Sequence, residues 1–391
     1  MTSFELATAT RILFGAGRLA DAAAEVAALG VSRVLLATGR SGDRSGTLAR
    51  SLEARGIAVV PFRVEGEPTV ELARAGTERA RAERCDGVVA IGGGSAIDGG
   101  KAVAALAANE GDVLDYLEVV GRGRPLARPS LPFVAVPTTA GTGSEVTRNA
   151  VLGSAQAGVK ASLRSPLMLP RLAIVDPDLL AGAHPAQLAA SGLDALAQLV
   201  EPYLSARANP VTDALAGEGM RRSARSLRRA CLSGLDAGAR EDLALASLMG
   251  GLCLANAGLG AVHGFAAAAG GMFSAPHGAV CAALLVASLE VNLRALRARE
   301  PGHPALDRFR HVAGWLTGRP DAAAEDGIAW IAGLVRDLGV PGLSRWGMGS
   351  ADVPALVERA GRASSMRSNP IALLDEELRE IAERSMGPAA R

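Results

Sequence analysis

The chain has 391 residues, more than one hydrophobic core usually supports, so we expect two domains. Its 41 basic and 40 acidic residues leave a net charge of +1, and 3% of residues are aromatic; this argues against a nucleic-acid partner, which would favour basic patches and stacking rings. The four cysteines form no Cys-x-x-Cys pair, and the N-terminal stretch lacks the uninterrupted apolar segment of a signal peptide, so we expect a reduced, cytoplasmic protein.

Short apolar runs alternate with helical stretches through the first half of the chain, a rhythm typical of a parallel α/β sheet. The expected strands cover residues 33–37, 57–60, 87–91, 133–136 and 172–175. Beyond Asp176 and Pro177, Ala- and Leu-rich segments broken by Gly and Pro predict an all-helical second domain. We therefore expect an α/β domain over residues 1–180 and an all-α domain over residues 181–391, with ligands facing the carboxyl ends of the strands.

The third apolar run, Gly87–Ile91, leads directly into the consecutive glycines Gly92–Gly94. Such glycines let the backbone approach an anion closely, and a helix starting at Ser95 would direct its free N–H groups at that anion, so this turn is a candidate phosphate site. It is not a Walker A loop, because Lys101 comes one position too late. The alternative is a turn whose glycines serve only tight packing of strand against helix.

A second glycine pattern, Gly15–Ala20, matches G-x-G-x-x-A after the apolar run Arg11–Phe14. A dinucleotide site of this type would carry an acidic residue at the end of the next strand, where this chain has Thr38–Ser41. The match alone is therefore weak support for a nucleotide site.

The loop Pro137–Thr147 follows the fourth expected strand and offers five hydroxyl groups among small residues. Such a loop can hydrogen-bond a ribose or a pyrophosphate without crowding it. A Ser/Thr-rich surface turn is the alternative. Because this loop and the glycine turn both follow strands of one parallel sheet, we expect them at the same sheet edge.

The stretch Leu243–Leu289 contains no Asp, Glu, Lys or Arg. It is interrupted by Asn256, Gly270–Gly271 and Pro276 and is rich in Ala and Gly, so we expect a buried helical core around a site and no membrane span. The basic cluster at residues 221–229 is expected to be a solvated helix face.

Candidate metal ligands lie in the helical half. Asp194 and Gln198 are four residues apart and share one helix face, and their partners would be His263 and His277. On one straight helix the two histidines would lie roughly 21 Å apart, but Gly270–Gly271 and Pro276 allow the chain to turn back. The alternative, that both histidines are satisfied core residues, remains open.

Together these segments resemble the iron-containing (group III) alcohol dehydrogenase family, whose fold is shared with dehydroquinate synthase. The resemblance covers nearly the whole chain. It is carried by Phe14–Gly17, the glycine turn, the Pro137–Thr147 loop, Ser191–Ala195, Ala208–Ala216, His263 and Pro276–Gly278. It implies an α/β dinucleotide-binding domain, a helical metal and substrate domain, a homo-oligomer, and hydride transfer between NAD(P)H and a small aldehyde, ketone or alcohol.

The resemblance also implies roles for particular residues. Cofactor contacts fall on Gly93, Gly94, Ser95 and Asp98 for the pyrophosphate and ribose, on Thr138, Thr139, Thr142 and Ser144 nearer the nicotinamide, and on Lys160 at the ribose. The metal ligands, for Fe²⁺ or Zn²⁺, fall on Asp194, Gln198, His263 and His277, and the two histidines act in catalysis by holding the metal.

Two departures from the family pattern weaken the metal expectation. Gln198 stands where metal-bearing members carry His, and Ala267 replaces a histidine often found at the substrate site. An amide oxygen is a weaker donor than imidazole for a transition metal, so weak or dispensable metal binding is expected, as in a maleylacetate reductase-like enzyme. A lyase like dehydroquinate synthase and a non-catalytic nucleotide-binding protein are further alternatives.

The cofactor preference is expected to lean towards NADPH. Many NAD-preferring members carry Asp where this chain has Gly39, and that carboxylate repels a 2′-phosphate. Arg40, Ser41 and Arg44 follow closely and would accept the phosphate.

Overall fold

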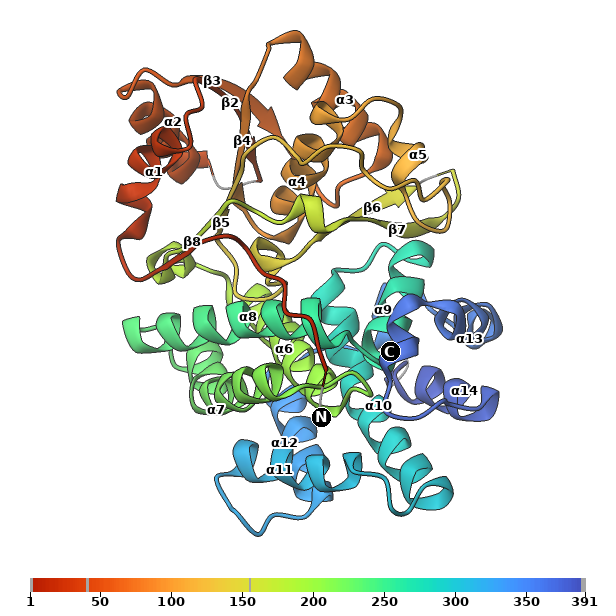
Figure 1. Ribbon diagram of the computed structural model, residues 1–391. Coiled ribbons are helices and arrows are strands. Elements are labelled where there is room, and N and C mark those ends of the chain that lie inside the picture. The colour runs from red at the N-terminus through yellow and green to blue at the C-terminus, as the bar shows by residue number, and fades with distance from the viewer. Residues whose placement is uncertain (1–2, 40–41, 155, 388–391) are drawn as a thin grey trace. The chain divides into compact units, whose positions relative to one another are not determined.

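The computed structural model describes residues 3–39, 42–154 and 156–387, which divide into two compact units (Figure 1). The α/β unit comprises residues 7–139 and 143–181, and the helical unit begins at Gly182. Residues 3–6 and Ala140–Thr142 belong to the helical unit, which differs from the expected division of the chain. Gly141 explains part of this difference, because a Cβ there would lie 2.9 Å from the Cβ of Ser191.

The α/β unit is built on a six-stranded parallel sheet in the order β1-β8-β5-β4-β2-β3. The parallel sheet and five of its strands were expected from the apolar runs, and β1 adds a sixth. Its strands are β1 Ile12–Phe14, β2 Arg33–Thr38, β3 Ala58–Arg63, β4 Gly87–Gly92, β5 Phe133–Pro137 and β8 Leu172–Val175. Its α-helices are α1 Ala22–Ala28, α2 Gly42–Glu53, α3 Val70–Ala82, α4 Gly94–Ala108 and α5 Val113–Tyr116. Its 3₁₀ helices are η1 Arg18–Asp21, η2 Ser144–Val146, η3 Pro166–Met168 and η4 Pro177–Leu180.

One feature of this unit was not expected from the sequence. The strands β6 Asn149–Ser154 and β7 Val159–Arg164 form an antiparallel hairpin outside the main sheet. Their buried and partly exposed residues alternate, so neither strand forms the continuous apolar run that identified the parallel strands.

Both faces of the parallel sheet are apolar, because helices cover both. Val34 and Leu36 of β2 pack in a core with residues of α1 and α2. Leu35 and Ala37 of the same strand pack in a second core with residues of α3 and α4. Successive residues of a strand thus face opposite sides of the sheet, and both sides are apolar cores. The strands are therefore uninterrupted apolar runs in the sequence.

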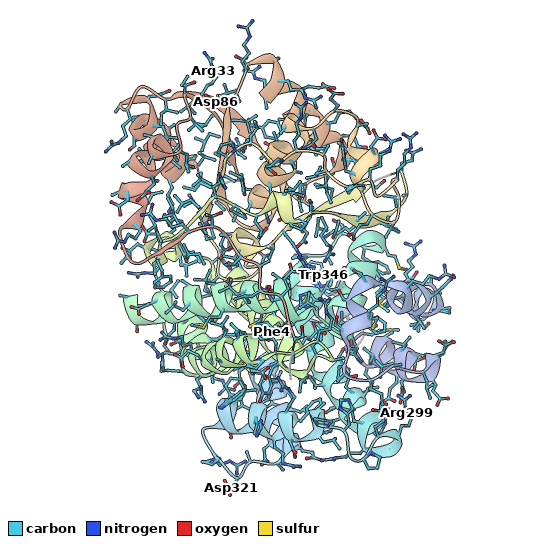
Figure 2. The ribbon with its side chains drawn as sticks, in the orientation of Figure 1. Phe4, Arg33, Asp86, Arg299, Asp321 and Trp346 are labelled. Atoms are coloured by element: carbon cyan, nitrogen blue, oxygen red, sulfur yellow. The ribbon has the colours of Figure 1, made fainter. Side chains whose placement is uncertain are left out.

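A carboxylate joins the starts of two neighbouring strands. Asp86, just before β4, accepts hydrogen bonds from the backbone N–H groups of Ser32 and Arg33 at the start of β2 (Figure 2). These bonds lower the pKa of Asp86, although its partial burial opposes them. The contact fixes the register of β2 against β4, and both strands end at the candidate phosphate site.

The helical unit surrounds the long helix α6, which is buried on all sides from Gly192 to Leu204. Its helices are α6 Pro185–Leu204, α7 Pro210–Leu232, α8 Ala237–Ala257, α9 Ala261–Met272, α10 His277–Arg299, α11 Ala305–Thr317, α12 Ala324–Asp337, α13 Val353–Arg362 and α14 Asp375–Arg384. Its 3₁₀ helices are η5 Leu343–Trp346, η6 Ser350–Asp352 and η7 Ser364–Ser368. Helices α7, α8 and α10 all contact α6.

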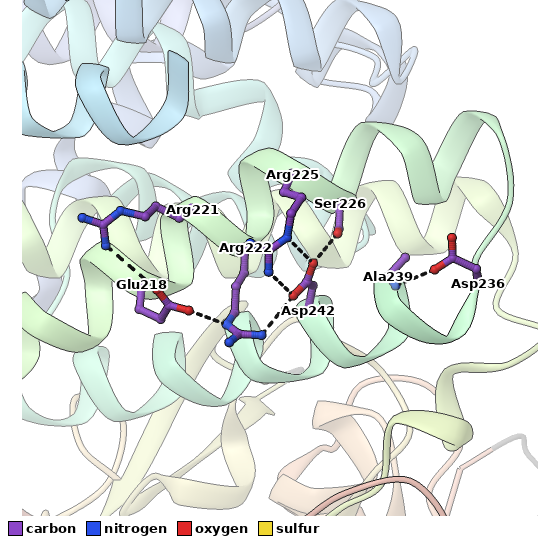
Figure 3. A network of polar contacts seen from close by, with 8 residues as sticks. All are labelled: Glu218, Arg221, Arg222, Arg225, Ser226, Asp236, Ala239 and Asp242. Carbon is purple, nitrogen blue, oxygen red and sulfur yellow. Dashed lines mark hydrogen bonds and ion pairs between the residues drawn. The ribbon is translucent and has the colours of Figure 1, made fainter. Parts of the chain in front are cut away.

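The basic cluster on α7 is not simply a solvated face. Arg222 and Arg225 both bind the carboxylate of Asp242 on α8, and Ser226 donates to the same group (Figure 3). Asp242 is 7% exposed, and these partners hold its pKa low despite its burial. Part of the cluster therefore ties α7 to α8, whereas Arg221 remains half exposed beside Glu218.

The uncharged stretch 243–289 is divided among α8, α9 and α10. By length and composition α10 could cross a membrane, and α8 with α9 passes the same test as a pair bent by 96°. The most apolar window of α10 is 78% buried within the protein, which is typical of a core helix.

Candidate functional site

The glycine turn between β4 and α4 is shaped for close backbone approach. Gly92 has a φ of +158°, and a Cβ there would lie 2.6 Å from the Cβ of Ala96. Helix α4 starts at Gly94 with Gly93 as its N-cap, and within the described segments the cap has no side-chain hydrogen bond. The first N–H groups of α4 are therefore free to face an anion.

Three predicted cofactor residues lie around this turn because β2, β4 and β5 are neighbours. A Cβ on Gly92 would lie 3.3 Å from the backbone nitrogen of Gly39, at the end of β2. A Cβ on Gly93 would lie 3.3 Å from the Oγ1 of Thr139, and Thr138 donates its N–H to the carbonyl of Gly92 at 2.9 Å. Gly39, the glycine turn, Thr138 and Thr139 thus share one sheet edge.

Asp98 and Ser144 are brought together, but their polar atoms serve each other. The Ser144 hydroxyl donates to Asp98 Oδ1, and the N–H of Val151 donates to Oδ2 at 3.0 Å. Burial raises the pKa of Asp98, and Lys101 partly offsets this effect. The pair joins α4 to η2 and β6, directly below the glycine turn.

Lys101 is fully buried and organises the same loop. Its Nζ donates to the carbonyls of Ser144 at 2.6 Å and Asn149 at 2.9 Å and to the Oγ1 of Thr147 at 2.9 Å. Burial lowers the pKa of Lys101 to about 8, and burial raises the pKa of Glu145 to about 7. Lys101, whose position excluded a Walker A loop, is thus an internal support of the Pro137–Thr147 loop.

Of the remaining predicted cofactor residues, Lys160 and Thr142 contact other segments, whereas Ser95 is at the turn itself. Lys160 on β7 pairs with Glu67 at 3.5 Å. Thr142 belongs to the short segment that packs with the helical unit. Ser95 lies in the first turn of α4.

The weak pattern at Gly15–Ala20 has a structural role. The carboxylate of Asp176 accepts the N–H groups of Gly17 at 3.0 Å and Leu19 at 2.9 Å. The backbone donors that a phosphate would need are therefore already used.

A second constellation lies within the helical unit and contains three of the four predicted metal ligands. Asp194 on α6, His263 on α9, and His277 and Cys281 on α10 each offer one donor atom, and these atoms all lie within 4.8 Å of one another. His263 Nε2 is 3.3 Å from Asp194 Oδ1, and His277 Nε2 is 3.8 Å from the same oxygen.

The helix break after α9 brings the two histidines together. The chain leaves α9 at Met272 and starts α10 at His277, and the imidazole centroids are 5.6 Å apart. Gly278 allows α10 to approach α6 closely, because a Cβ at this position would lie 2.5 Å from the carbonyl oxygen of Ala190 on α6. Only glycine permits this contact between α10 and α6, which carries His277 to Asp194.

Glu201, one helical turn beyond Gln198 on α6, orients His263. Its Oε2 lies 2.5 Å from His263 Nδ1, and its Oε1 accepts the N–H of Val262 at 2.7 Å. The carboxylate therefore caps the start of α9 and holds Nδ1 as the donor, so that Nε2 faces Asp194. This is the carboxylate–histidine arrangement that accompanies metal ligands.

The charges of the cluster favour a cation. Burial lowers the pKa of His263, but Cys281, Glu201 and Asp194 outweigh it and raise this pKa well above its usual value. Cys281 raises the pKa of His277 to about 9. Burial opposes ionisation of Asp194, yet the two histidines bring its pKa to about 2. Protons therefore occupy the positions that a divalent metal would take.

The residues present fit a divalent metal ion. The Oε1 of Gln198 is buried and accepts no hydrogen bond from any residue that the structure describes, and the Oδ1 of Asp194 is buried with the imidazoles of His263 and His277 as its charged neighbours. Unsatisfied buried oxygens of this kind are costly unless a cation or water binds them. Carboxylate, imidazole and thiolate donors together suit zinc or iron.

Two members of this site were missed by the sequence analysis. Cys281 had been considered only as an unpaired cysteine, although its spacing of four from His277 places both on one face of a helix. Glu201 follows Asp194 by seven residues, which also gives one helix face. Helical spacing from the predicted ligands was the signal that could have found both.

Comparisons with known proteins match most of both halves of the chain. A family model for iron-containing alcohol dehydrogenase matches residues 9–177, and one for the C-terminal region of the Fe-containing alcohol dehydrogenase family matches residues 188–386.

Individual relatives agree with the family models. The chain is 36% identical over 377 residues to choline dehydrogenase of Bacillus subtilis, covering 94% of this chain and 91% of that protein. It is 39% identical over 366 residues to 1,3-propanediol dehydrogenase of Citrobacter freundii, covering 90% of this chain and 91% of that protein. A crystal structure of 1,3-propanediol oxidoreductase superposes with a TM-score of 0.90 at 34% identity, covering 98% of this chain and 100% of that one.

Proposed function

The chain belongs to the iron-containing alcohol dehydrogenase family and is an oxidoreductase of alcohols and aldehydes; from this premise we propose which of its residues do the work. The family uses a nicotinamide cofactor and a divalent metal. We propose that the β4–α4 turn binds the dinucleotide and that Asp194, His263 and His277 hold the metal. The observation that carries this proposal is the buried cluster of donor atoms within 4.8 Å of one another.

At the dinucleotide site, we propose that backbone N–H groups make the main contacts to the cofactor. The free N–H groups at Gly94 and Ser95 would take the pyrophosphate, since Gly93 has no side chain to block it. Thr138 and Thr139 border the same edge and would hydrogen-bond the cofactor. Asp98 and Ser144 hydrogen-bond each other and so support the loop. Any contact that they make to the ribose uses the hydrogen-bonding capacity that this bond does not occupy.

When bound, the metal polarises the carbonyl or alcohol oxygen and NAD(P)H carries the hydride. The chain's own task is to hold Asp194, His263 and His277 in place, with Glu201 keeping the proton of His263 on Nδ1. Ala267 has no titratable group, so we propose that the proton comes from water or a hydroxyl group rather than from that position.

We propose a preference for NADPH over NADH on the ground that Gly39 carries no carboxylate to repel a 2′-phosphate. Arg40 and Ser41 lie outside the described residues. Arg44 donates to the carbonyls of Leu179 and Ala181, so its guanidinium already has partners. The preference therefore rests on Gly39, and equal kcat/KM for NADH and NADPH would contradict it.

The proposed substrates are small aldehydes, ketones or alcohols, and the proposed setting is the cytoplasm, in a homo-oligomer. The relatives reported above give no support to the maleylacetate reductase alternative. Cysteine usage supports the setting, because Cys85, Cys231, Cys253 and Cys281 are all free thiols. Light scattering of the purified protein measures the assembly.

The test is to measure metal content and turnover together. Protein purified anaerobically is analysed by elemental mass spectrometry and assayed for NAD(P)H oxidation with a panel of small aldehydes. About one metal per chain, with activity lost in Asp194→Asn, is the expected result. A metal-free protein that still reduces carbonyls would favour the metal-independent alternative, and cofactor binding without turnover on any carbonyl would favour a non-catalytic protein.

A further inference from the structure

We propose that Cys281 supplies the fourth protein ligand of the metal site, in the place expected for Gln198, and that the site therefore selects zinc over iron. The inference rests on the proposed metal-dependent function and concerns the same site. The ligand set expected from the sequence contains no thiol.

Three of the donor-atom distances are close to those of a zinc tetrahedron, and a fourth, His277 Nε2 to Asp194 Oδ1 at 3.8 Å, is about 0.5 Å longer than the tetrahedral value. Zinc bonds of about 2.0–2.1 Å to N or O and about 2.3 Å to S place tetrahedral neighbours about 3.3 Å apart for N and O, and about 3.6 Å apart for S and N. Asp194 Oδ1 and His263 Nε2 are 3.3 Å apart. Cys281 Sγ lies 3.5 Å from His277 Nε2 and 3.8 Å from His263 Nε2.

Three separate helices supply these atoms, so the spacing is not a by-product of one helix. Asp194 comes from α6, His263 from α9, and His277 with Cys281 from α10. The only local pair is His277 and Cys281, one turn apart. Cys281 is fully buried among these donors, facing the imidazoles of both histidines.

Charge and softness favour the thiol over the amide of Gln198. Metal binding replaces the S–H proton of Cys281 by a metal–sulfur bond, and the proton leaves to solvent without any change in oxidation state. With Asp194 and Cys281 both anionic, two negative ligands balance a divalent ion in a site where burial makes unpaired charge costly. A neutral amide oxygen cannot supply this balance. Thiolate ligands favour zinc in mixed nitrogen and sulfur sites.

Gln198 then has a different role. Its Oε1 is buried and without a hydrogen-bond partner in the described ranges, so it stands one turn from Asp194 as a free acceptor. We assign it to a water molecule or substrate hydroxyl beside the metal rather than to the metal. With four protein ligands, a zinc ion would accept the substrate oxygen only by expanding to five-coordination.

The test replaces the native metal by Co²⁺ and records the absorption spectrum of the full-length protein. A cobalt–thiolate bond gives a strong near-ultraviolet charge-transfer band, which imidazole and carboxylate ligands do not give. We expect the band in the unmodified protein and in Gln198→Ala, and its loss in Cys281→Ser. Cys231→Ser is the matched control, because Cys231 lies on α7 outside the donor cluster and its loss should leave the band unchanged.

A competition measurement completes the test. Protein stripped of metal is offered equal Zn²⁺ and Fe²⁺ under anaerobic conditions, and bound metal is counted. We expect zinc in at least tenfold excess for the unmodified protein and a smaller ratio in Cys281→Ser. Circular dichroism confirms that each variant is folded.

The outcomes separate this inference from the proposed function. Bound cobalt with no charge-transfer band, in an enzyme that still turns over, would overturn the role of Cys281 and leave the dehydrogenase standing. A band that disappears in Cys281→Ser, in a protein without activity on any carbonyl, would support the ligand and refute the function. A band that persists in Cys281→Ser would also overturn the inference.

Discussion

At the scale of single residues, Glu201 links the metal site to the helix that carries it. The carboxylate binds His263 Nδ1 at 2.5 Å and caps the start of α9. Replacing Glu201 by Gln keeps the shape but weakens the hydrogen bond to imidazole, so we expect metal affinity to fall about 10–100-fold. Competition with a chelator measures this affinity.

The control for Glu201→Gln is Glu241→Gln, at an exposed position on α8 of the same unit. It should leave metal affinity unchanged. If Glu201→Gln bound metal as tightly as the unmodified protein, the carboxylate would be only a helix cap.

The buried Glu145 makes stability depend on pH. Burial raises its pKa to about 7 in the folded protein, against 4.5 for the ordinary side chain. The neutral form therefore stabilises the fold fully below pH 4.5, and this contribution is lost as pH rises through 7. Glu145→Gln, which is always neutral, should unfold at the same temperature as the unmodified protein near pH 4 and be more stable by roughly 1–3 kcal/mol near pH 7.5.

Thermal unfolding at the two pH values measures this difference. Glu110→Gln is the control, because Glu110 is exposed in the same unit and its replacement should have no pH-dependent effect. A gain for Glu145→Gln that is equal at both pH values would contradict the explanation.

At the scale of elements, α4 begins at the candidate phosphate site and also packs on the sheet through glycines. A Cβ on Gly100 would lie 2.9 Å from the Cβ of Ala90 on β4 and 3.2 Å from that of Ala37 on β2. We therefore expect Gly100→Ala to destabilise the protein by about 1–3 kcal/mol, measured by chemical denaturation.

Gly333→Ala on α12 is the matched helical control. Its Cβ would meet only the flexible ends of Arg228 and Arg336, at 3.7 Å. Because alanine favours helix over glycine, this change should be neutral or stabilise by up to about 1 kcal/mol. Equal destabilisation by both changes would refute the packing argument. The packing interpretation of the glycine-rich segment is thus supported at Gly100, whereas the phosphate site at Gly93 and Gly94 stays a prediction.

The parallel strands could be predicted because each is buried on both faces, as Leu35 and Leu36 show by packing in opposite cores. The hairpin formed by β6 and β7 could not be found this way. Its strands carry Asn149, Lys160 and Arg164 between apolar residues, and this pattern is not distinguishable from a loop without knowledge of the surface they cover.

At the scale of the whole molecule, the metal site joins segments far apart in the sequence. Asp194 and His263 could be proposed because their motifs and the helix break were visible in the sequence. The spacing of four from His277 could have singled out Cys281 in the sequence, but only the packing of α10 on α6 at Gly278 shows that this helix face meets Asp194. Long-range helix packing, rather than residue type, decided the fourth donor.

The division into two units gives a direct way to follow the metal site. The protein's three tryptophans, Trp315, Trp330 and Trp346, all lie in the helical unit, so tryptophan fluorescence follows the unfolding of that unit. A metal that binds only the folded state adds about 2.7 kcal/mol of stability at a free concentration of 100 Kd. We expect removal of the metal by a chelator to lower the fluorescence-detected unfolding temperature, and re-addition to restore it.

Asp194→Asn should abolish the difference between metal-loaded and metal-free protein, because it removes the anionic oxygen shared by both histidines. A metal-dependent shift that survives Asp194→Asn would place the ion elsewhere in the chain.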